Sequence, residues 1–311
     1  MIRFAPTLCL LPLPAMADVP TVMTDIAPLH SLTAQVMGEL GTPSVLLPPG
    51  ADPHDFALRP SDAGRLADAE IVFWVGESLT PWLKEPLETL APQAVHFSLL
   101  ETSNWTALEA RDLDAFALHD EDHDHDHGHS HDHDHDHGDF DPHAWLDPVV
   151  AGIWAQEIAT ELARIDPENA ATYHANAAAI VARLTDLTTD VTAKLSSVAD
   201  QSYVLPHDGY QYFESRFGLT ALAAIAGIDA RTPGPAQVAE LRAKLAEDDV
   251  VCVFSDAEIG DRWAQLITEG TSANTTQIDG VGLGLTEGPE LYTQLITRLA
   301  DDFSQCLGAG M

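Results

Sequence analysis

From Glu168 to Ala199 the sequence contains neither glycine nor proline, and alanine is frequent. The preceding Asp166-Pro167 pair is typical of a helix start, with aspartate as the N-cap and proline at the first helical position. About 32 residues in a single helix would be roughly 48 Å long. A flexible linker would instead contain glycine, serine or several short loops. We therefore expect a rigid helix over 166–199 that joins two separate parts of the chain.

Short apolar runs alternate with helical patterns on both sides of this predicted helix. The expected strands are 20–26, 44–48, 71–75 and 94–100 before it, and 202–206, 219–225, 250–254 and 275–279 after it. The expected helices are 28–40, 60–69, 80–91, one starting near Pro148, 208–217, 235–248, 260–269 and 288–307. Such alternation predicts parallel sheets covered by helices. The predicted fold class is α/β, with two lobes of four mainly parallel strands each, over 18–165 and 200–311.

The first seventeen residues resemble a secretory signal. Arg3 gives a positive start, an apolar run follows to Leu13, and Ala15-Met16-Ala17 offers a cleavage site between small residues. The alternative is a buried N-terminal segment. No later run reaches the roughly 18 apolar residues that a membrane span needs. We therefore expect export to a bacterial periplasm, with residues 1–17 removed and no lipid anchor.

Removal of the signal would leave two of the three cysteines, Cys252 and Cys306. An even number of cysteines in an oxidising compartment predicts a disulfide between them. The alternative is a pair of free buried thiols.

The chain is strongly acidic, with 14 basic and 49 acidic residues and a net charge of −35. Nucleic acids and anionic membranes repel such a polyanion, so neither is an expected partner, whereas cations are attracted. Segment 119–141 concentrates this character and has few apolar residues to bury, so we expect an insertion that is disordered without metal. Its histidines are His119, His123, His125, His127, His129, His131, His133, His135 and His137.

Three further histidines occur where a strand is expected to lead into a helix. They are His54 in GADPHDFALRPSD, His143 in DPHAWLDP, and His207 in PHDGYQYFESRFGL. Ligands of open parallel sheets collect beyond the carboxyl ends of the strands, where such loops lie. A lone histidine is more often a surface or packing residue, but three at equivalent places favour a shared metal ion.

These three motifs, in this order, resemble the metal-site motifs of the periplasmic zinc-binding proteins of ABC transporters, a ZnuA-like family. The acidic histidine-rich insertion and the Cys252/Cys306 pair also resemble that family, and the likeness covers essentially the whole mature chain. It implies two α/β lobes on a rigid linking helix, with one metal ion held in the cleft between them. It also implies delivery of Zn²⁺ as cargo to a membrane permease, with a periplasmic zinc metallochaperone as a further partner and the protein itself a monomer.

Carried over to this sequence, the family pattern makes His54 and His143 the ligands from the first lobe and His207 the ligand from the second. The fourth position stays open. Some relatives use an aspartate after the last strand, where Asp279 stands here, while others use water or an acid just before the first histidine. Pro53 occupies that last position. Asp279 could equally be a hydrogen-bonding carboxylate on a glycine-rich turn.

Three neutral imidazoles and an oxygen suit tetrahedral Zn²⁺, whereas Mn²⁺ prefers more carboxylates. The expected function is capture of zinc for uptake, and a manganese or other divalent-metal transporter protein is the alternative within the family. A zinc hydrolase would need an acid or base beside the metal, and no HExxH pattern and no adjoining glutamate occurs in the three loops. A passive zinc buffer would use the insertion alone. We expect no enzymatic activity, and a zinc affinity that falls below about pH 6, near the unperturbed imidazole pKa.

Overall fold

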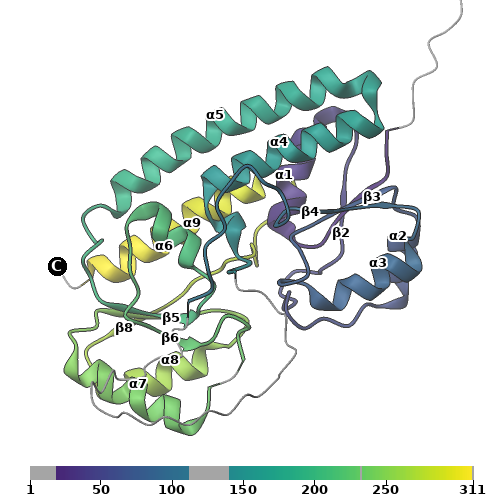
Figure 1. Cartoon of the computed structure of the whole chain (residues 1–311). Helices are drawn as coiled ribbons and strands as arrows, with labels where there is room; N and C mark the ends of the chain where they lie inside the picture. Colours follow the sequence, from purple (N-terminus) through teal and green to yellow (C-terminus); the bar gives the residue numbers. More distant parts are fainter. Residues whose placement is uncertain (1–18, 112–139, 232, 310–311) are drawn as a thin grey trace, which may run out of the picture.

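The computed structural model describes residues 19–111, 140–231 and 233–309 (Figure 1). Its strands are β1 (Val22–Thr24), β2 (Ser44–Val45), β3 (Ile71–Trp74), β4 (Val95–Ser98), β5 (Tyr203–His207), β6 (Ala223–Ala226), β7 (Cys252–Ser255) and β8 (Asn274–Gln277). Its α-helices are α1 (Ala27–Met37), α2 (Pro60–Ala67), α3 (Lys84–Leu90), α4 (Pro148–Ile165), α5 (Ala170–Leu195), α6 (Gln211–Phe217), α7 (Pro235–Glu247), α8 (Asp261–Thr268) and α9 (Leu291–Gly308). Short 3₁₀ turns lie at Gly38–Leu40, Pro81–Leu83, Ala144–Leu146 and Pro167–Asn169.

The strands form two four-stranded sheets with the same order. The first is β2-β1-β3-β4 and the second is β6-β5-β7-β8, and every pairing within them is parallel. In each sheet the second strand in sequence pairs with one side of the first strand, and the third and fourth strands lie on its other side. The carboxyl end of that first strand is therefore a switch point, where ligands of open sheets bind. The predicted α/β class with two four-stranded sheets is confirmed.

The predicted linking helix is present with a different start. Pro167–Asn169 forms a 3₁₀ turn and α5 follows with 26 residues, so the regular α-helix starts three residues after Pro167. Asp166 does not cap the first turn through its side chain. Its Oδ2 instead accepts hydrogen bonds from Asn169 Nδ2 at 2.6 Å and from the Tyr173 hydroxyl at 2.8 Å. These bonds fix the sharp turn that reverses the chain from α4 into α5.

The first α6 residue and the first β6 residue also lie later than the sequence predicts. Gly218, with φ 70°, ends α6 in the left-handed conformation that glycine adopts readily. The next residues turn the chain, because Leu219 N–H donates to the Glu214 carbonyl and Ala221 N–H donates to the Glu214 carboxylate. The apolar run at 219–225 is therefore part turn and part strand.

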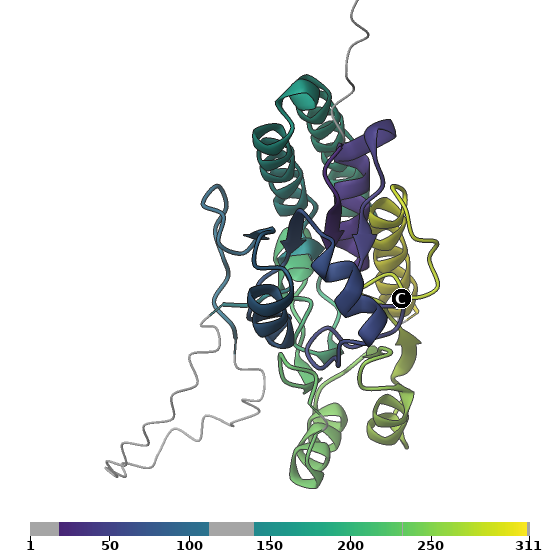
Figure 2. The ribbon, with the colours of Figure 1, turned by 90° about the vertical axis from the view of Figure 1, so that its right-hand side faces the viewer.

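One hydrophobic core extends through both lobes. It includes Trp154 of α4, Tyr203 of β5 and Phe303 of α9, all fully buried. Helix α5 packs against α1, α4 and α9, and α4 lies beside it along much of its length (Figure 2). A smaller cluster covers the other face of the second sheet under α7 and α8. The two sheets are thus held by a continuous packed layer as well as by a helix.

Cys252 and Cys306 form a disulfide that fastens β7 to α9. The predicted pairing is confirmed, and the alternative of two free thiols is wrong. Of the described helices, none is both long and apolar enough to cross a bilayer. The predicted signal segment 1–17 and the nine histidines of the insertion, from His119 to His137, lie outside the described residues.

Candidate metal centre

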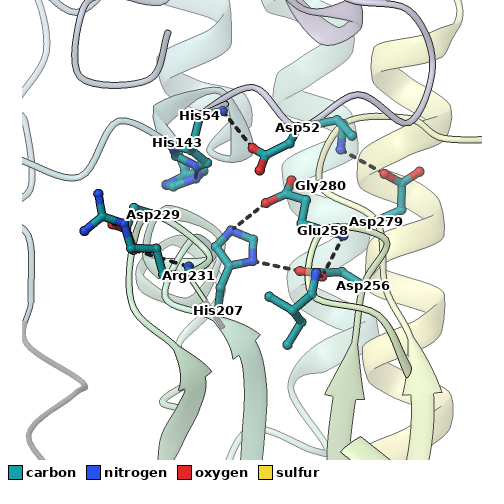
Figure 3. Close-up of polar contacts among 12 residues, drawn as sticks. Asp52, His54, His143, His207, Asp229, Arg231, Asp256, Glu258, Asp279 and Gly280 are labelled. Atoms are coloured by element: carbon teal, nitrogen blue, oxygen red, sulfur yellow. Dashed lines mark hydrogen bonds and ion pairs between the residues drawn. The ribbon is translucent and has the colours of Figure 1, made fainter. Parts of the chain in front are cut away.

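His54, His143 and His207 converge between the two lobes (Figure 3). One ring nitrogen of each lies within 4.8 Å of the other two. His54 lies in the loop after β2, His143 precedes the 3₁₀ turn that leads into α4, and His207 is the last residue of β5. The Nε2 atoms of His54 and His143 are 3.3 Å apart. Two nitrogens each about 2.0–2.1 Å from a tetrahedral ion are separated by about 3.3 Å, so this spacing fits Zn²⁺.

His143 is buried, and a carboxylate orients its ring. Its Nδ1 lies 2.7 Å from Asp141 Oδ1, and the same oxygen accepts the backbone N–H of His143 at 2.9 Å. Donation from Nδ1–H leaves the lone pair on Nε2, which faces the other two histidines. Asp141 was expected to end the acidic insertion, but it is fully buried and belongs to this centre.

His207 is held in the same way from the second lobe. Its Nδ1 lies 2.7 Å from Asp256 Oδ2, while its Nε2 is buried with no hydrogen-bond partner among the described residues. Burial lowers the pKa of His207, but the nearby charges of Glu258 and Asp256 and the hydrogen bond to Asp256 outweigh it. The net result raises that pKa to about 9. Nε2 is therefore a strongly basic, correctly placed donor atom.

The loop after His207 approaches the two buried rings closely at Gly209. A Cβ atom at this position would lie 2.2 Å from His207 Nε2 and 3.0 Å from His143 Nε2. The first distance is far below van der Waals contact, so only glycine leaves both nitrogens accessible to an ion. The motif PHDGYQYF contains this glycine, but the sequence does not reveal why it is needed.

His54 is held less firmly. Its backbone N–H donates to Asp52 Oδ1 at 2.8 Å, which forms a tight turn, but its ring has no carboxylate partner among the described residues. Burial, followed by the charges of His143 and His207, lowers the pKa of His54 well below its ordinary value. Its ring is therefore neutral near pH 7 and available as a ligand.

Two carboxylates that sequence reasoning missed lie beside the histidines. Glu258, in the turn after β7, has Oε2 3.6 Å from His207 Nε2. Glu258 and Asp52 also form a further group with His54, whose potential ligand atoms all lie within 4.8 Å of one another. The sequence signal was available for Glu258, because it follows a predicted strand in the same kind of loop as the histidines.

Asp279 is in none of the candidate groups among the described residues. Its Oδ1 accepts the N–H groups of Val281 and Gly282, both at 2.9 Å, while Oδ2 is buried without a hydrogen-bond partner in the described part of the chain. These bonds are those of a carboxylate that stabilises a glycine-rich turn. A role for Asp279 as the fourth ligand stays a prediction.

Other aspartates near the three motifs stabilise structure. Asp147 accepts the N–H of Val149 as the N-cap of α4 and pairs with Arg216. Asp208 pairs with Arg111, which also contacts Glu214. Arg111 belongs to the stretch before the insertion, so this ion pair ties the first lobe to the loop that follows His207.

Comparisons with known proteins agree with this arrangement. Residues 22–306 match the family described as "Zinc-uptake complex component A periplasmic". The chain is 38% identical over 304 residues to the high-affinity zinc uptake system protein ZnuA of Brucella abortus (strain 2308), covering 92% of this chain and 91% of the relative. It is 39% identical over 311 residues to the ZnuA protein of Paracoccus denitrificans (strain Pd 1222), covering 96% and 94%.

Solved structures share the fold at lower identity. A crystal structure of ZnuA superposes with a TM-score of 0.76 at 21% identity, over 93% of this chain and 99% of the other. The laminin-binding protein Lmb of Streptococcus agalactiae, described as having adhesin and metal transporting activity, gives a TM-score of 0.74 at 24% identity, over 93% and 99%. At these identities the likeness establishes the architecture.

Proposed function

The chain belongs to the ZnuA family of periplasmic zinc-uptake components, and from this premise we propose that it captures Zn²⁺ with high affinity and delivers it to an ABC permease. In this proposal His54, His143 and His207 bind the ion as cargo. The protein acts as a monomer in the periplasm after loss of residues 1–17, and a zinc metallochaperone is a further partner.

The observation that carries the proposal is the matched geometry of the two buried histidines. Asp141 and Asp256 each accept from an Nδ1–H, which directs both Nε2 lone pairs to the same point. Metal-bound histidines generally donate their second ring N–H in this way. The 3.3 Å separation between His54 and His143 Nε2 atoms supports an ion of the size and geometry of Zn²⁺.

Manganese is the alternative cargo, and the nearby carboxylates of Asp52 and Glu258 favour it in one respect, because Mn²⁺ prefers oxygen ligands. Three imidazoles at the centre favour zinc. Competition between Zn²⁺ and Mn²⁺ against a chromophoric chelator decides between them, and we expect zinc to displace manganese fully. Displacement of zinc by equimolar manganese would contradict the proposal.

The hydrolase alternative loses its support, even though Glu258 Oε2 lies 3.6 Å from His207 Nε2, because the family consists of transport components.

The test of the ligands is removal of each imidazole in turn. We expect His54→Ala, His143→Ala and His207→Ala each to weaken the tight site by about a hundredfold or more, since loss of groups that merely orient a ligand already costs 10–100-fold. His174→Ala is the matched control, because His174 is exposed on α5 away from the site. Equal affinity of the four variants would show that zinc binds elsewhere.

The histidine-rich segment is proposed to gather ions and pass them to the centre. Its described ends support this role: Leu108 N–H donates to the Tyr212 hydroxyl, and Asp141 N–H donates to the Leu108 carbonyl, beside His143. Ordering a long loop around an ion costs conformational entropy, so its sites should be weaker than the centre. Deletion of residues 120–138 should leave one tight site per chain, and loss of that site would refute this division.

A further inference from the structure

Glu258 is a partly exposed residue whose Oε2 atom is buried and lies 3.6 Å from His207 Nε2. Its side chain is 13% exposed and its Oε2 has no hydrogen-bond partner among the described residues. A carboxylate oxygen removed from water without a partner costs free energy. A cation beside Oε2 would offset this cost, and the oxygen faces the histidine cluster (Figure 3).

The turn after β7 places the Glu258 side chain beside the histidine cluster. Asp256 Oδ1 accepts the N–H of Glu258 at 3.1 Å and that of Ile259 at 2.9 Å. Its other oxygen, Oδ2, accepts from His207. One aspartate thus positions both the imidazole and the carboxylate that the second lobe contributes.

Asp52 brings a second carboxylate from the first lobe. Its Oδ1 accepts the His54 N–H, which holds the carboxylate next to the imidazole of His54. Asp52, His54 and Glu258 offer one ligand atom each within 4.8 Å of one another, so two oxygens and one nitrogen form a second candidate group that shares only His54 with the three histidines.

The two groups differ in burial and share one member. Asp52, His54 and Glu258 are all partly exposed, whereas His143 and His207 are each 3% exposed. We propose that Asp52, His54 and Glu258 form an outer position for the cargo ion, which it occupies on entering or leaving the three-histidine centre. The proposal rests on the proposed function, because His54 is a ligand in both positions.

Such a position would divide the transfer of the ion from water to the three histidines into two smaller steps. The carboxylates attract a hydrated cation and replace part of its water shell with oxygen ligands. Because His54 is common to both sets, the ion keeps one protein ligand while it exchanges Asp52 and Glu258 for His143 and His207.

The first test is the rate of Zn²⁺ association, followed by tryptophan fluorescence, since the indole N–H of Trp82 donates to the Pro53 carbonyl next to His54. Asp52→Asn and Glu258→Gln each remove a charge and keep an acceptor oxygen, so the turns are retained. In about 0.5 M NaCl, where long-range attraction is screened, we expect each variant to bind Zn²⁺ about tenfold more slowly than the parent.

Asp55→Asn is the matched control, because Asp55 is exposed in the same loop and belongs to none of the candidate groups. It should bind at the parental rate. Rates for Asp52→Asn and Glu258→Gln equal to that of Asp55→Asn would overturn the outer position. If the parent itself lacks a tight zinc site at the three histidines, the proposed function fails instead.

The second test locates the ion. The double variant His143→Ala/His207→Ala loses the inner set and keeps the outer one, so crystals soaked with Zn²⁺ should give an anomalous peak between Asp52, His54 and Glu258. Adding Glu258→Gln should remove that peak. Absence of the peak in the folded double variant would overturn the proposal, and circular dichroism verifies folding.

Discussion

In the first sheet the strand at the switch point, β1, is followed by Asp25, whereas in the second sheet the corresponding strand, β5, ends at His207. Both side chains bind the residue that follows the third strand. Asp25 Oδ2 accepts the N–H of Val75, and His207 Nδ1 donates to Asp256. Asp25 uses its other oxygen to accept from Ile26, so both oxygens serve the backbone. His207 keeps one nitrogen free for an ion.

Identical topology therefore does not give the two lobes identical chemistry. In the first lobe the residue at the switch point, Asp25, only holds the backbone in place. The histidines of this lobe come from the irregular loop after β2 and from the segment that follows the insertion. In the second lobe the ligand is part of a strand, buried and held by Asp256. Among the proposed ligands, His54, which is partly exposed and has no carboxylate hydrogen-bonded to its ring in the described chain, is thus the adjustable one, and His207 is the fixed one.

The largest effect should follow from filling the space beside the fixed ligand. Gly209→Ala would place a methyl group 2.2 Å from His207 Nε2, which blocks the nitrogen or displaces its ring. We expect tight zinc binding to fall by about a thousandfold, beyond the 10–100-fold typical of orienting residues. Gly64→Ala is the control, since a Cβ at Gly64 of α2 would meet nothing within 4 Å. Unchanged affinity in Gly209→Ala, measured by chelator competition, would show that the ion does not use His207 Nε2.

A smaller effect on zinc affinity should follow from removing the carboxylate that orients a histidine ring. Asp256→Asn and Asp141→Asn each weaken the hold on one imidazole, and we expect a 10–100-fold loss of zinc affinity from either. The exposed charge of Asp55 again provides the control. If both substitutions leave zinc affinity at the parental value, the two hydrogen bonds do not fix the imidazoles for zinc binding, and His207 does not differ from His54 in this respect.

The pH dependence of zinc binding should also reflect the second lobe. Zinc needs the unprotonated Nε2, and the pKa of His207 in the metal-free protein is about 9, so zinc must displace its proton at neutral pH. Apparent affinity should rise about tenfold per pH unit towards pH 9 and level off above it, while the lowered pKa of His54 keeps that ring out of this window. The pH range over which zinc affinity changes therefore lies above the value near pH 6 that an unperturbed imidazole predicts.

Calorimetry in buffers of different ionisation enthalpy measures the protons released. Release of about one proton near pH 7.5 is expected for the parent, and less for Asp256→Asn, because loss of that carboxylate lowers the pKa of His207. No proton release in either protein would contradict the raised pKa.

The smallest effect should be on overall shape. The hydrophobic core runs through both lobes and α5 packs against helices from each, so zinc binding should adjust the loop of His54 and leave the lobes in place. Small-angle scattering of a variant lacking residues 120–138 should give a radius of gyration that changes by less than about 1 Å on adding zinc, against roughly 20 Å for a chain of this size. A larger change would show that the lobes themselves move.

The sequence alone was sufficient for the features that depend on local pattern. Absence of glycine and proline predicted the long helix, alternating apolar runs predicted the two parallel sheets, and the two cysteines after the predicted signal segment could pair in one way. His54, His143 and His207 were grouped as candidate ligands because loops at the carboxyl ends of parallel strands lie together. The structure brings one ring nitrogen of each within 4.8 Å of the other two, although His143 follows the insertion and not a described strand.

Tertiary structure alone decided which acids join the histidines. Asp52 and Glu258 are far apart in sequence and come from different lobes. Glu258 follows a predicted strand, as His54 does, but no local pattern indicates that it and Asp52 lie beside the same imidazole. Asp141 belongs to an acidic run by composition, yet two hydrogen bonds from His143 make it part of the centre, while Asp279 accepts from the backbone of Val281 and Gly282. The physical reason is that strand ends fix where a residue lies, but the direction of its side chain is set by loop turns and by contacts from the opposite lobe.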